Sequence, residues 1–390
     1  MLSHIAYNNA MDKKFQHYDL KLINPPFASD ATDLIVELER LRSKFIASST
    51  PKHIFFEVKR IFHLLESIAS ARIEGNRTTI AQYIETKLSP SKQPNEAIRE
   101  IENMEKALDF IEENVEHSPI DRAFLSEIHK ITTANLTKEG SSTPGEYRRS
   151  GVSIVGSRHI PPDPIKVHDY MEELFKFIND NDAHKYDLIK TALSHHRFVW
   201  IHPFDNGNGR TVRLLTYAML IKQGFSLHNG RIINPTAVFC SDREQYYNLL
   251  SAADDGSDKG LLNWCSYMLN GLKNEIVKID RLCDYQYLKK TILLPTLDFA
   301  LQRKLITDIE RKILHLSIEN DELTNSDVRK TVPQFSKVHI SRLITSLKEK
   351  KMLCAVKEKA RKYLKSFYNN YLLRGVISLL GENGFLPKED

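Results

Sequence analysis

Apolar residues recur at intervals of three and four along most of this 390-residue chain. This spacing is typical of helices that bury one face and expose the other. It predicts a mainly α fold in which most of the helices pack together as a bundle. The segments that show it are 32–48, 55–72, 98–114, 121–132, 165–179 and 186–199.

A glycine-rich segment at 201–213 follows the last of these helices, with the sequence Ile-His-Pro-Phe-Asp-Asn-Gly-Asn-Gly-Arg-Thr-Val-Arg. Gly207 and Gly209 let the backbone turn tightly and approach a ligand closely. The apolar spacing of 211–220 predicts a helix directly after the turn. The N–H groups and the positive dipole end of a helix N-terminus attract phosphate, so the segment predicts an anion-binding loop.

Three further side chains of this segment indicate chemistry at the anion. Arg210 and Arg213 are three residues apart in the predicted first helical turn, so they share a face and reach the same anion. Cations at a helix N-terminus oppose its dipole unless an anion is present. His202 has an ordinary pKa that suits proton transfer near neutral pH. Together they favour a base beside a polyphosphate over the alternative, a loop that caps a core helix with His202 as a buried packing residue.

The same segment resembles the signature of the Fic family, H-P-F-x-[D/E]-G-N-G-R-x-x-R, most of whose members transfer AMP from ATP to a hydroxyl side chain of a target protein. The resemblance implies a Fic-type helical bundle with ATP as substrate. In it His202 would deprotonate a Ser, Thr or Tyr hydroxyl of the target, which attacks the α-phosphate while pyrophosphate leaves. The residues that would cradle the phosphates are Gly207, Asn208 and Gly209, with Arg210 at the β-phosphate and Arg213 at the γ-phosphate.

Asn206 is the one departure from the signature, because the family usually has an acidic residue there that holds Mg²⁺. The carbonyl oxygen of asparagine can still bind Mg²⁺, but it brings no charge and should bind the ion more weakly. The neighbouring Asp205 is expected to point elsewhere. The resemblance therefore implies Mg²⁺ as a cofactor that is weakly held through Asn206.

The segment Ser70-Ala71-Arg72-Ile73-Glu74-Gly75 resembles the inhibitory motif [S/T]-x-x-x-E-[G/N] of the same family. In members that carry the motif, the glutamate pairs with the second signature arginine, here Arg213, and keeps ATP from its productive pose. A carboxylate at this place competes with the γ-phosphate for the guanidinium. The implied inhibitory residues are Ser70, Glu74 and Gly75, on a helix that precedes the catalytic core. The alternative is that Glu74 is a solvated helix residue.

Short alternation around a glycine, closed by prolines, predicts a small β-hairpin or flap over 152–160. In the family such a flap positions the target protein by strand addition. The implied target-binding residues are Val152, Ser153, Ile154 and Val155. The alternative is an ordinary surface hairpin.

The segment 243–254 resembles the family helix that borders the nucleotide base. Tyr246 and Tyr247 would then contact the nucleotide, and Asp254 stands where relatives often carry an asparagine that contacts adenine. An aspartate accepts a hydrogen bond from an exocyclic amine but donates none. The alternative interpretation is that both tyrosines are core residues, as aromatic residues on amphipathic helices usually are.

The chain changes character after the connecting helices near 264–287. Predicted helices at 304–318, 325–331 and 336–350, followed by strands at 352–356 and 363–368, resemble a winged helix-turn-helix. Residues 328–365 hold twelve Lys or Arg against two Glu, whereas the whole chain has a net charge of only +5. The side chains expected to meet DNA are Lys337, His339 and Arg342 on the recognition helix, with the lysines of the wing at backbone phosphates. The alternative is a solvated basic surface or a domain that docks proteins.

Composition bounds the class of protein. With 41% hydrophobic and 27% charged residues, the chain is ordinary for a soluble globular protein. No run approaches the roughly 18 apolar residues of a membrane span, and Met1–Ile5 does not begin a secretion signal. The four scattered cysteines indicate neither a disulfide framework nor a zinc site, so we expect a cytoplasmic protein without a membrane partner. The resemblance adds a possible homodimer.

These observations predict five successive parts and two hypotheses of function. The parts are an N-terminal extension at 1–50, an inhibitory-helix region at 51–95, a Fic catalytic core at 96–275, connecting helices at 276–302 and a winged-helix domain at 303–390. The first hypothesis is a self-inhibited protein adenylyltransferase (AMPylator), a nucleotidyltransferase. The second is a DNA-binding transcriptional regulator whose Fic core is a nucleotide sensor or a weak enzyme.

Overall fold

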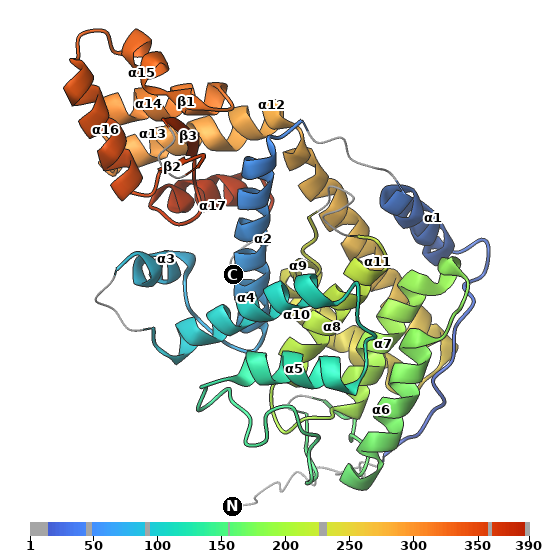
Figure 1. The fold of residues 1–390 in the computed structure, drawn as a ribbon. Helices are drawn as coiled ribbons and strands as arrows, with labels where there is room; N and C mark the ends of the chain where they lie inside the picture. The colour runs from blue at the N-terminus through green and yellow to red at the C-terminus, as the bar shows by residue number, and fades with distance from the viewer. Residues whose placement is uncertain are drawn as a thin grey trace, which may run out of the picture. The chain divides into compact units, whose positions relative to one another are not determined.

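The structure is a computed structural model that describes residues 15–43, 49–89, 94–154, 157–225, 232–357 and 361–386. The described residues are mainly helical and divide into two compact units (Figure 1). The first unit consists of the described residues within Met1–Leu38, Asp109–Gln223 and Asp242–Asn270. The second consists of those within Glu39–Leu108, Gly224–Ser241 and Gly271–Asp390.

The predicted helices of the N-terminal two thirds are confirmed, with ends that shift by a few residues. The helices of the first unit are α5 Arg122–Thr133, α6 Pro164–Asn179, η1 His184–Tyr186, α7 Asp187–Ile201, α8 Asn208–Lys222 and α10 Arg243–Ala253. Three helices contain residues of both units, namely α1 Asp30–Ser43, α4 Glu96–Asn114 and α11 Asp258–Asp280. Residues 44–48 of the first predicted helix lie outside the described residues.

The core of the first unit is built around α7, which packs against both α6 and α8, while α5 packs against α8. Nearly every side chain of α7 is buried, as expected for a helix that is surrounded on all sides. The buried Trp264 of α11 donates its ring N–H to the carbonyl of Ala192 on α7 at 2.7 Å. This packing fixes α7, whose C-terminus carries His202.

Local sequence explains where the neighbouring helices begin. Asp121 caps α5 by accepting from the N–H of Phe124 at 2.9 Å. Asp163 caps α6, and Pro164 takes the first helical position, where the missing N–H costs nothing. Both helix starts follow from short-range chemistry and were predictable.

The β-hairpin predicted over 152–160 was wrong for the residues that the structure describes. Residues 151–154 and 157–160 form no strand, and the N–H of Ser157 donates to the carbonyl of Ile154 at 3.1 Å. The alternation of Val152, Ser153 and Ile154 therefore lacks a pairing partner among the described residues. Val155 lies outside the described residues.

The second unit has its own apolar core, which α2, the helix Lys52–Ile73, enters along most of its length. The carboxylate of Glu66 on α2 accepts from the backbone N–H of Thr236, the first residue of α9 (Thr236–Ser241), at 3.1 Å. The other helices of this unit before residue 303 are α3 Ile80–Leu88, η3 Arg281–Cys283, α12 Tyr285–Leu288, η4 Lys289–Leu293 and α13 Leu294–Gln302.

The C-terminal part of this unit has a helix, a strand, two helices and two strands in chain order. These elements are α14 Asp308–Glu319, β1 Leu323–Thr324, α15 Asn325–Thr331, α16 Lys337–Glu349, β2 Leu353–Ala355 and β3 Lys362–Lys365, after which α17 Leu372–Glu382 ends the described helices. The strands form an antiparallel sheet in the order β1-β3-β2, with Leu323 opposite Tyr363 and Cys354 opposite Leu364. The sequence predicted β2 and β3 but missed the two-residue β1.

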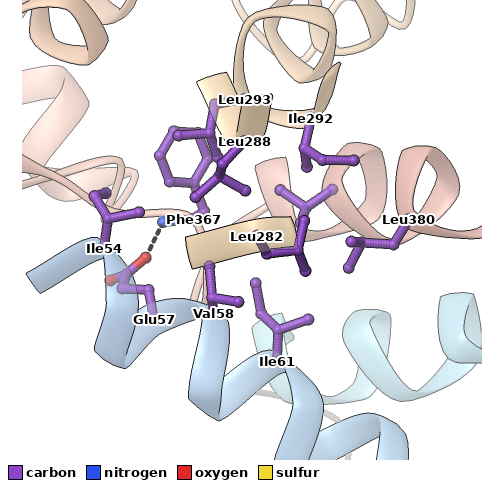
Figure 2. Close-up of a pocket in the computed structure, with 11 residues that line it drawn as sticks. Ile54, Glu57, Val58, Ile61, Leu282, Leu288, Ile292, Leu293, Phe367 and Leu380 are labelled. Carbon is purple, nitrogen blue, oxygen red and sulfur yellow. Dashed lines mark hydrogen bonds between the residues drawn. The ribbon is translucent and has the colours of Figure 1, made fainter. Parts of the chain in front are cut away.

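A small cavity in the second unit is lined by side chains of α2, η3, α12, η4 and α17 and by Phe367 (Figure 2). It measures about 10 Å³, which is room for roughly one water molecule. Glu57 at its edge accepts from Ser366 Oγ at 2.6 Å and from the N–H of Phe367, so its carboxylate holds the chain after β3. The cavity is a packing feature and no ligand site. Among the described helices, none combines the length and the apolar character that crossing a bilayer requires.

Candidate active site

The site begins where α7 ends. His202 has φ 51° and ψ 61°, a left-handed conformation that costs a non-glycine residue about 1 kcal/mol or more. Pro203 follows it, and a proline disfavours the helical conformation in the residue before it. The N–H of His202 still donates to the carbonyl of Phe198 at 2.9 Å, which completes the last turn. The helix therefore stops at Ile201 and turns the imidazole of His202 out of the helical path.

A backbone contact of His202 favours one tautomer. Nδ1 lies 3.4 Å from the carbonyl oxygen of Val199, an acceptor, which favours the tautomer with the ring proton on Nδ1. Nε2 is then the nitrogen that can take up a proton. The side chain is half-buried, which suits a base that must reach a substrate.

The loop after His202 is closed by the side-chain amide of Asn208. Its Oδ1 accepts from the N–H of Phe204 at 2.9 Å, and its Nδ2 donates to the carbonyl of Phe204 at 2.9 Å. Phe204 is fully buried and stacks on the imidazole of His129, with ring centroids 3.8 Å apart. Asn208 therefore shapes the loop with its side chain, and its backbone N–H is the group that can meet a phosphate.

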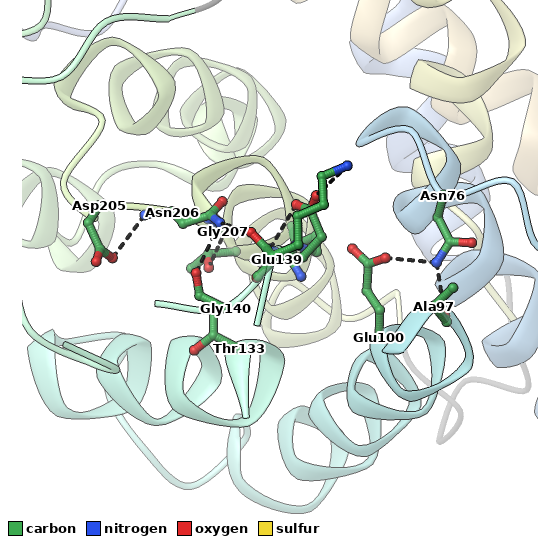
Figure 3. A network of polar contacts seen from close by, with 12 residues as sticks. Asn76, Ala97, Glu100, Thr133, Glu139, Gly140, Asp205, Asn206 and Gly207 are labelled. Carbon is green, nitrogen blue, oxygen red and sulfur yellow. Dashed lines mark hydrogen bonds and ion pairs between the residues drawn. The ribbon is translucent and has the colours of Figure 1, made fainter. Parts of the chain in front are cut away.

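Asn206 and Asp205 anchor a second loop, at 138–142, to the first one (Figure 3). Nδ2 of Asn206 donates to the carbonyl of Gly140 at 2.9 Å, and its Oδ1 accepts from the N–H of Gly207 at 2.7 Å. Asp205 accepts from the hydroxyls of Ser141 and Ser142, each at 2.5 Å. Burial alone would raise the pKa of Asp205, but these hydrogen bonds outweigh it and hold the pKa below its ordinary value.

The predicted metal ligand Asn206 and its acidic neighbour Asp205 are thus both engaged within the protein. Oδ1 of Asn206 already accepts a hydrogen bond from the N–H of Gly207, so a cation would compete with this bond. The carboxylate of Asp205 already accepts several hydrogen bonds. Within the described ranges, no group of three or more His, Cys, Asp or Glu side chains is arranged to hold a metal ion.

Gly207 is the N-cap of α8, and the local geometry requires a glycine at this position. It has φ 74°, and a Cβ there would lie 2.9 Å from Cγ2 of Thr133, so only glycine fits. A glycine N-cap supplies no side-chain acceptor for the first-turn N–H groups, those of Asn208 and Gly209. The start of α8 therefore has no side-chain cap, and its first-turn N–H groups are the donors that the predicted anion loop requires.

The helix begins three residues earlier than predicted, so Arg210 lies in its first turn but Arg213 in its second. Both side chains are 1% exposed. Nη2 of Arg210 donates to the carbonyl of Glu139 at 2.6 Å and lies 3.8 Å from Oε2 of the same residue. Burial, together with the nearby charges of Arg213 and His196, holds the pKa of His195 well below its ordinary value. Both arginines are therefore buried side chains of α8, within the first unit.

The residues predicted to border the nucleotide base separate into two groups. Tyr246 is 2% exposed, and its hydroxyl bonds Nε2 of His195 at 2.9 Å, so it is a core residue, as the alternative interpretation had it. Tyr247 is 43% exposed and remains a candidate for contact with a ligand. Oδ1 of Asp254 lies 3.2 Å from Nε2 of His196, which orients this carboxylate.

The three predicted inhibitory residues lie at the C-terminal end of α2, in the second unit. Ser70 is fully buried, and the half-buried Glu74 is the C-cap. Gly75 follows with φ 100°, and its N–H donates to the carbonyl of Arg72 at 2.9 Å. A carboxylate at a helix C-terminus opposes the dipole, so Glu74 is not placed there for the stability of α2.

The turn after Glu74 is held by Asn76, as Figure 3 shows. Its Nδ2 donates to the carbonyl of Ala97 at 2.9 Å and to Oε2 of Glu100 at 2.7 Å. These bonds tie the end of α2 to the start of α4 within the second unit. They therefore hold the backbone that follows Glu74 in place.

Residues 119–220 match the model of the Fic/DOC family. This range contains α5 to α7, most of α8, and the loop between the last two, with His202, both arginines and Asn206. The chain contains a Fic/DOC family domain. The protein adenylyltransferase Fic of Aedes aegypti is 29% identical over 228 residues, which cover 56% of this chain and 43% of that protein. The protein of the same name from Drosophila melanogaster is 30% identical over 200 residues, which cover 50% of this chain and 37% of that protein. The chain thus spans less than half the length of these curated relatives.

Solved structures share the fold. A Fic family protein from Desulfovibrio desulfuricans G20 superposes with a TM-score of 0.55 at 18% identity, covering 90% of this chain and 98% of that one. Fic-1 from C. elegans gives a TM-score of 0.51 at 20% identity, covering 64% and 72%. At such identities the likeness concerns the arrangement of helices and not the chemistry.

Two residues that organise the Fic/DOC domain were missed in the sequence. Arg148 donates hydrogen bonds to backbone carbonyl groups, among them that of His202. Nδ1 of His129 accepts from the N–H of Gly145 at 2.8 Å, and its Nε2–H donates to the carbonyl of Asn206 at 3.0 Å. Nothing in the sequence separates Arg148 from Arg149, or His129 from any other histidine on an amphipathic helix. Their roles arise only when distant loops meet.

His129 gives a pH prediction. Burial is the main cause that lowers its pKa to about 4, so the ring is neutral at pH 7. In the unfolded chain it would take up a proton near its ordinary pKa of about 6.5. The stability from this site is therefore fully present above pH 6.5 and declines as the pH falls toward 4. We expect histidine-selective NMR to show a ring that titrates near pH 4, assigned by its absence in His129→Gln; a midpoint near 6.5 would contradict the buried, bridging role.

Proposed function

We propose that this chain is a self-inhibited protein adenylyltransferase that transfers AMP from ATP to a Ser, Thr or Tyr hydroxyl of a target protein. The observation that carries the proposal is the left-handed His202, with Nε2 as its proton-accepting nitrogen, next to the glycine-capped start of α8. The names of the curated relatives support the same activity. In this proposal the catalytic core is 96–275, and Val152, Ser153 and Ile154 contact the target.

The reaction follows from these positions. Nε2 of His202 removes the proton of the target hydroxyl, and the hydroxyl oxygen forms a bond to the α-phosphorus of ATP. The bond from that phosphorus to the bridging oxygen breaks, and pyrophosphate leaves. The N–H groups of Asn208 and Gly209, with Arg210 and Arg213, hold the phosphates and the charge that develops on them. Positioning and charge stabilisation supply most of the rate in such transfers, and a general base adds about 10²- to 10⁴-fold.

The proposal assigns no step to a metal ion that the protein itself holds. The donor set offers a neutral amide oxygen that already accepts from Gly207, next to a carboxylate that holds two serines. These groups do not fit a Mg²⁺ site of their own, so Mg²⁺ enters only as the counter-ion of the nucleotide phosphates.

Inhibition is assigned to Glu74. In the proposal its carboxylate forms an ion pair with the guanidinium of Arg213, and this pair prevents the γ-phosphate from binding there. The placement of Glu74 as C-cap of α2, against the helix dipole, supports a role other than helix stability. Release of Glu74 would then switch the enzyme on.

The proposal predicts the outcome of a labelling experiment with ATP labelled at the α-phosphate and Mg²⁺. Glu74→Gly should label itself or lysate proteins at least about tenfold more than the wild type, because Arg213 becomes available to the γ-phosphate; one such charge contact is worth about 1.5–3 kcal/mol. The double variant Glu74→Gly/His202→Ala should show no label. Label carried at the γ-phosphate should not be transferred.

Glu382→Gly is the matched control, since Glu382 is an exposed glutamate at the end of α17 in the same unit. It should label like the wild type. Absence of label in all variants, with ATP binding retained, would sink the adenylyltransferase proposal and leave the core as a nucleotide sensor.

A second function, DNA binding through the C-terminal part, is favoured by one observation. The basic side chains Arg329 and Lys330 of α15 and Lys337 and Arg342 of α16 are all exposed. The order of α14 to β3 resembles a winged helix-turn-helix with α16 as recognition helix. One predicted contact is corrected: Lys365 is 1% exposed, donates to the carbonyl of Asn320 at 2.9 Å, and has its pKa lowered by burial to about 8. Lys359 lies outside the described residues.

DNA binding predicts a salt-dependent affinity for duplex DNA, measured by fluorescence anisotropy with a labelled duplex of about 30 base pairs. The variant Lys337→Ala/Arg342→Ala should weaken binding and lower the slope of log K against log salt by about 1 for each phosphate that is no longer neutralised. Lys312→Ala on α14 is the control, because Lys312 pairs with Asp308. Equal slopes for all three proteins would contradict a role of α16 in DNA binding.

A further inference from the structure

Arg148 is a buried arginine that joins three separate parts of the first unit. It precedes the segment proposed to contact the target, and the residue is 3% exposed. Its guanidinium donates to backbone carbonyl oxygens. These are Ser150 O at 3.0 Å from Nη1, Pro162 O at 2.6 Å and Ile201 O at 3.4 Å from Nη2, and His202 O at 2.8 Å from Nε.

The four carbonyl groups belong to two functional segments. Ser150 and Pro162 stand at the two ends of the target-contacting segment, whereas Ile201 and His202 are the end of α7. The backbone N–H of Arg148 adds a bond to the carbonyl of Pro203 at 2.8 Å. One planar group therefore ties both ends of the segment to the residue that carries the proposed base.

The chemistry of these contacts requires an arginine. The last carbonyl groups of α7 lack partners within the helix, and a cation beside them is favoured by the helix dipole. The rigid fork of a guanidinium points several donors in fixed directions, whereas a lysine supplies one mobile ammonium. Burial lowers the pKa of Arg148, yet a guanidinium stays protonated in proteins, so its charge is held by these carbonyls.

We propose that Arg148 is a positioning residue for AMP transfer, which sets the target bound at Val152, Ser153 and Ile154 at a fixed distance from Nε2 of His202. This inference rests on the proposed function. In this inference the role of Arg148 differs from that of the arginines of α8. Arg148 aligns the target hydroxyl with the base, whereas Arg210 and Arg213 bind phosphates.

The kinetic test uses the Glu74→Gly background with Arg148→Met, which retains an unbranched apolar side chain but removes the donors. The expected result is a fall in kcat of about 10²-fold, the size of effect that a shift of about 1 Å produces, while the dissociation constant for ATP changes less than about twofold. Arg148→Lys should restore thermal stability toward the parent but not kcat. Arg149→Met is the control, because the neighbouring Arg149 has a side chain that is 83% accessible and pairs with Glu146 at the surface.

A second readout does not depend on activity. Arg148→Met should speed amide hydrogen exchange at 150–154 and at His202, with α5 and the middle of α8 unchanged. If the Glu74→Gly parent transfers no AMP, the proposed function fails, and the exchange pattern still decides whether Arg148 holds the two segments together. Unchanged exchange at these amides, or equal reductions of kcat and ATP affinity in Arg148→Met and Arg148→Lys, would overturn the positioning role.

Discussion

The left-handed turn at His202 is the constraint on which the site depends. A histidine adopts this conformation only where its surroundings hold it, and here Pro203 ends α7 while the Arg148 guanidinium takes the carbonyl of His202 at 2.8 Å. The turn sends the backbone back toward α8, where Gly207 repeats the left-handed conformation. Two left-handed residues, His202 and Gly207, therefore connect the end of α7 to the start of α8, and groups from elsewhere in the first unit contact both.

The interior around these turns is polar, and several of its buried side chains bridge two separate groups by hydrogen bonds. Neutral imidazoles serve as two-ended connectors: His129 bridges Gly145 and Asn206, and His195 bridges Thr216 and Tyr246. Because burial lowers the pKa of both rings, they keep one donor and one acceptor each at neutral pH. The side-chain amides on either side of Gly207 connect backbone groups in the same way. A network of this kind holds the anion loop rigid, so that its N–H groups need little reorganisation to meet a charged ligand.

Part of this was readable from the sequence. Apolar spacing located the helices, since burial of one face decides that pattern. The anion loop that the glycines and the two arginines indicate stays a prediction. The start of α8 was placed three residues late, because Asn208 and Gly209 are poor helix formers that tertiary bonds hold in the helix. The hairpin predicted over 152–160 was wrong for the residues of that range that the structure describes, because alternation does not tell whether a strand has a partner. The role of Arg148 and the burial of Tyr246 depend on residues far away in the chain, so no local pattern reveals them.

The central claim is that the first-turn N–H groups of α8, beside His202, receive the phosphates of the nucleotide. It is tested most directly by ¹⁵N NMR of the Glu74→Gly protein titrated with a non-hydrolysable ATP analogue. The account predicts saturable shifts at the amides of Asn208 and Gly209, with those of α5 and α17 unchanged. Saturable binding that leaves Asn208 and Gly209 unshifted would contradict it.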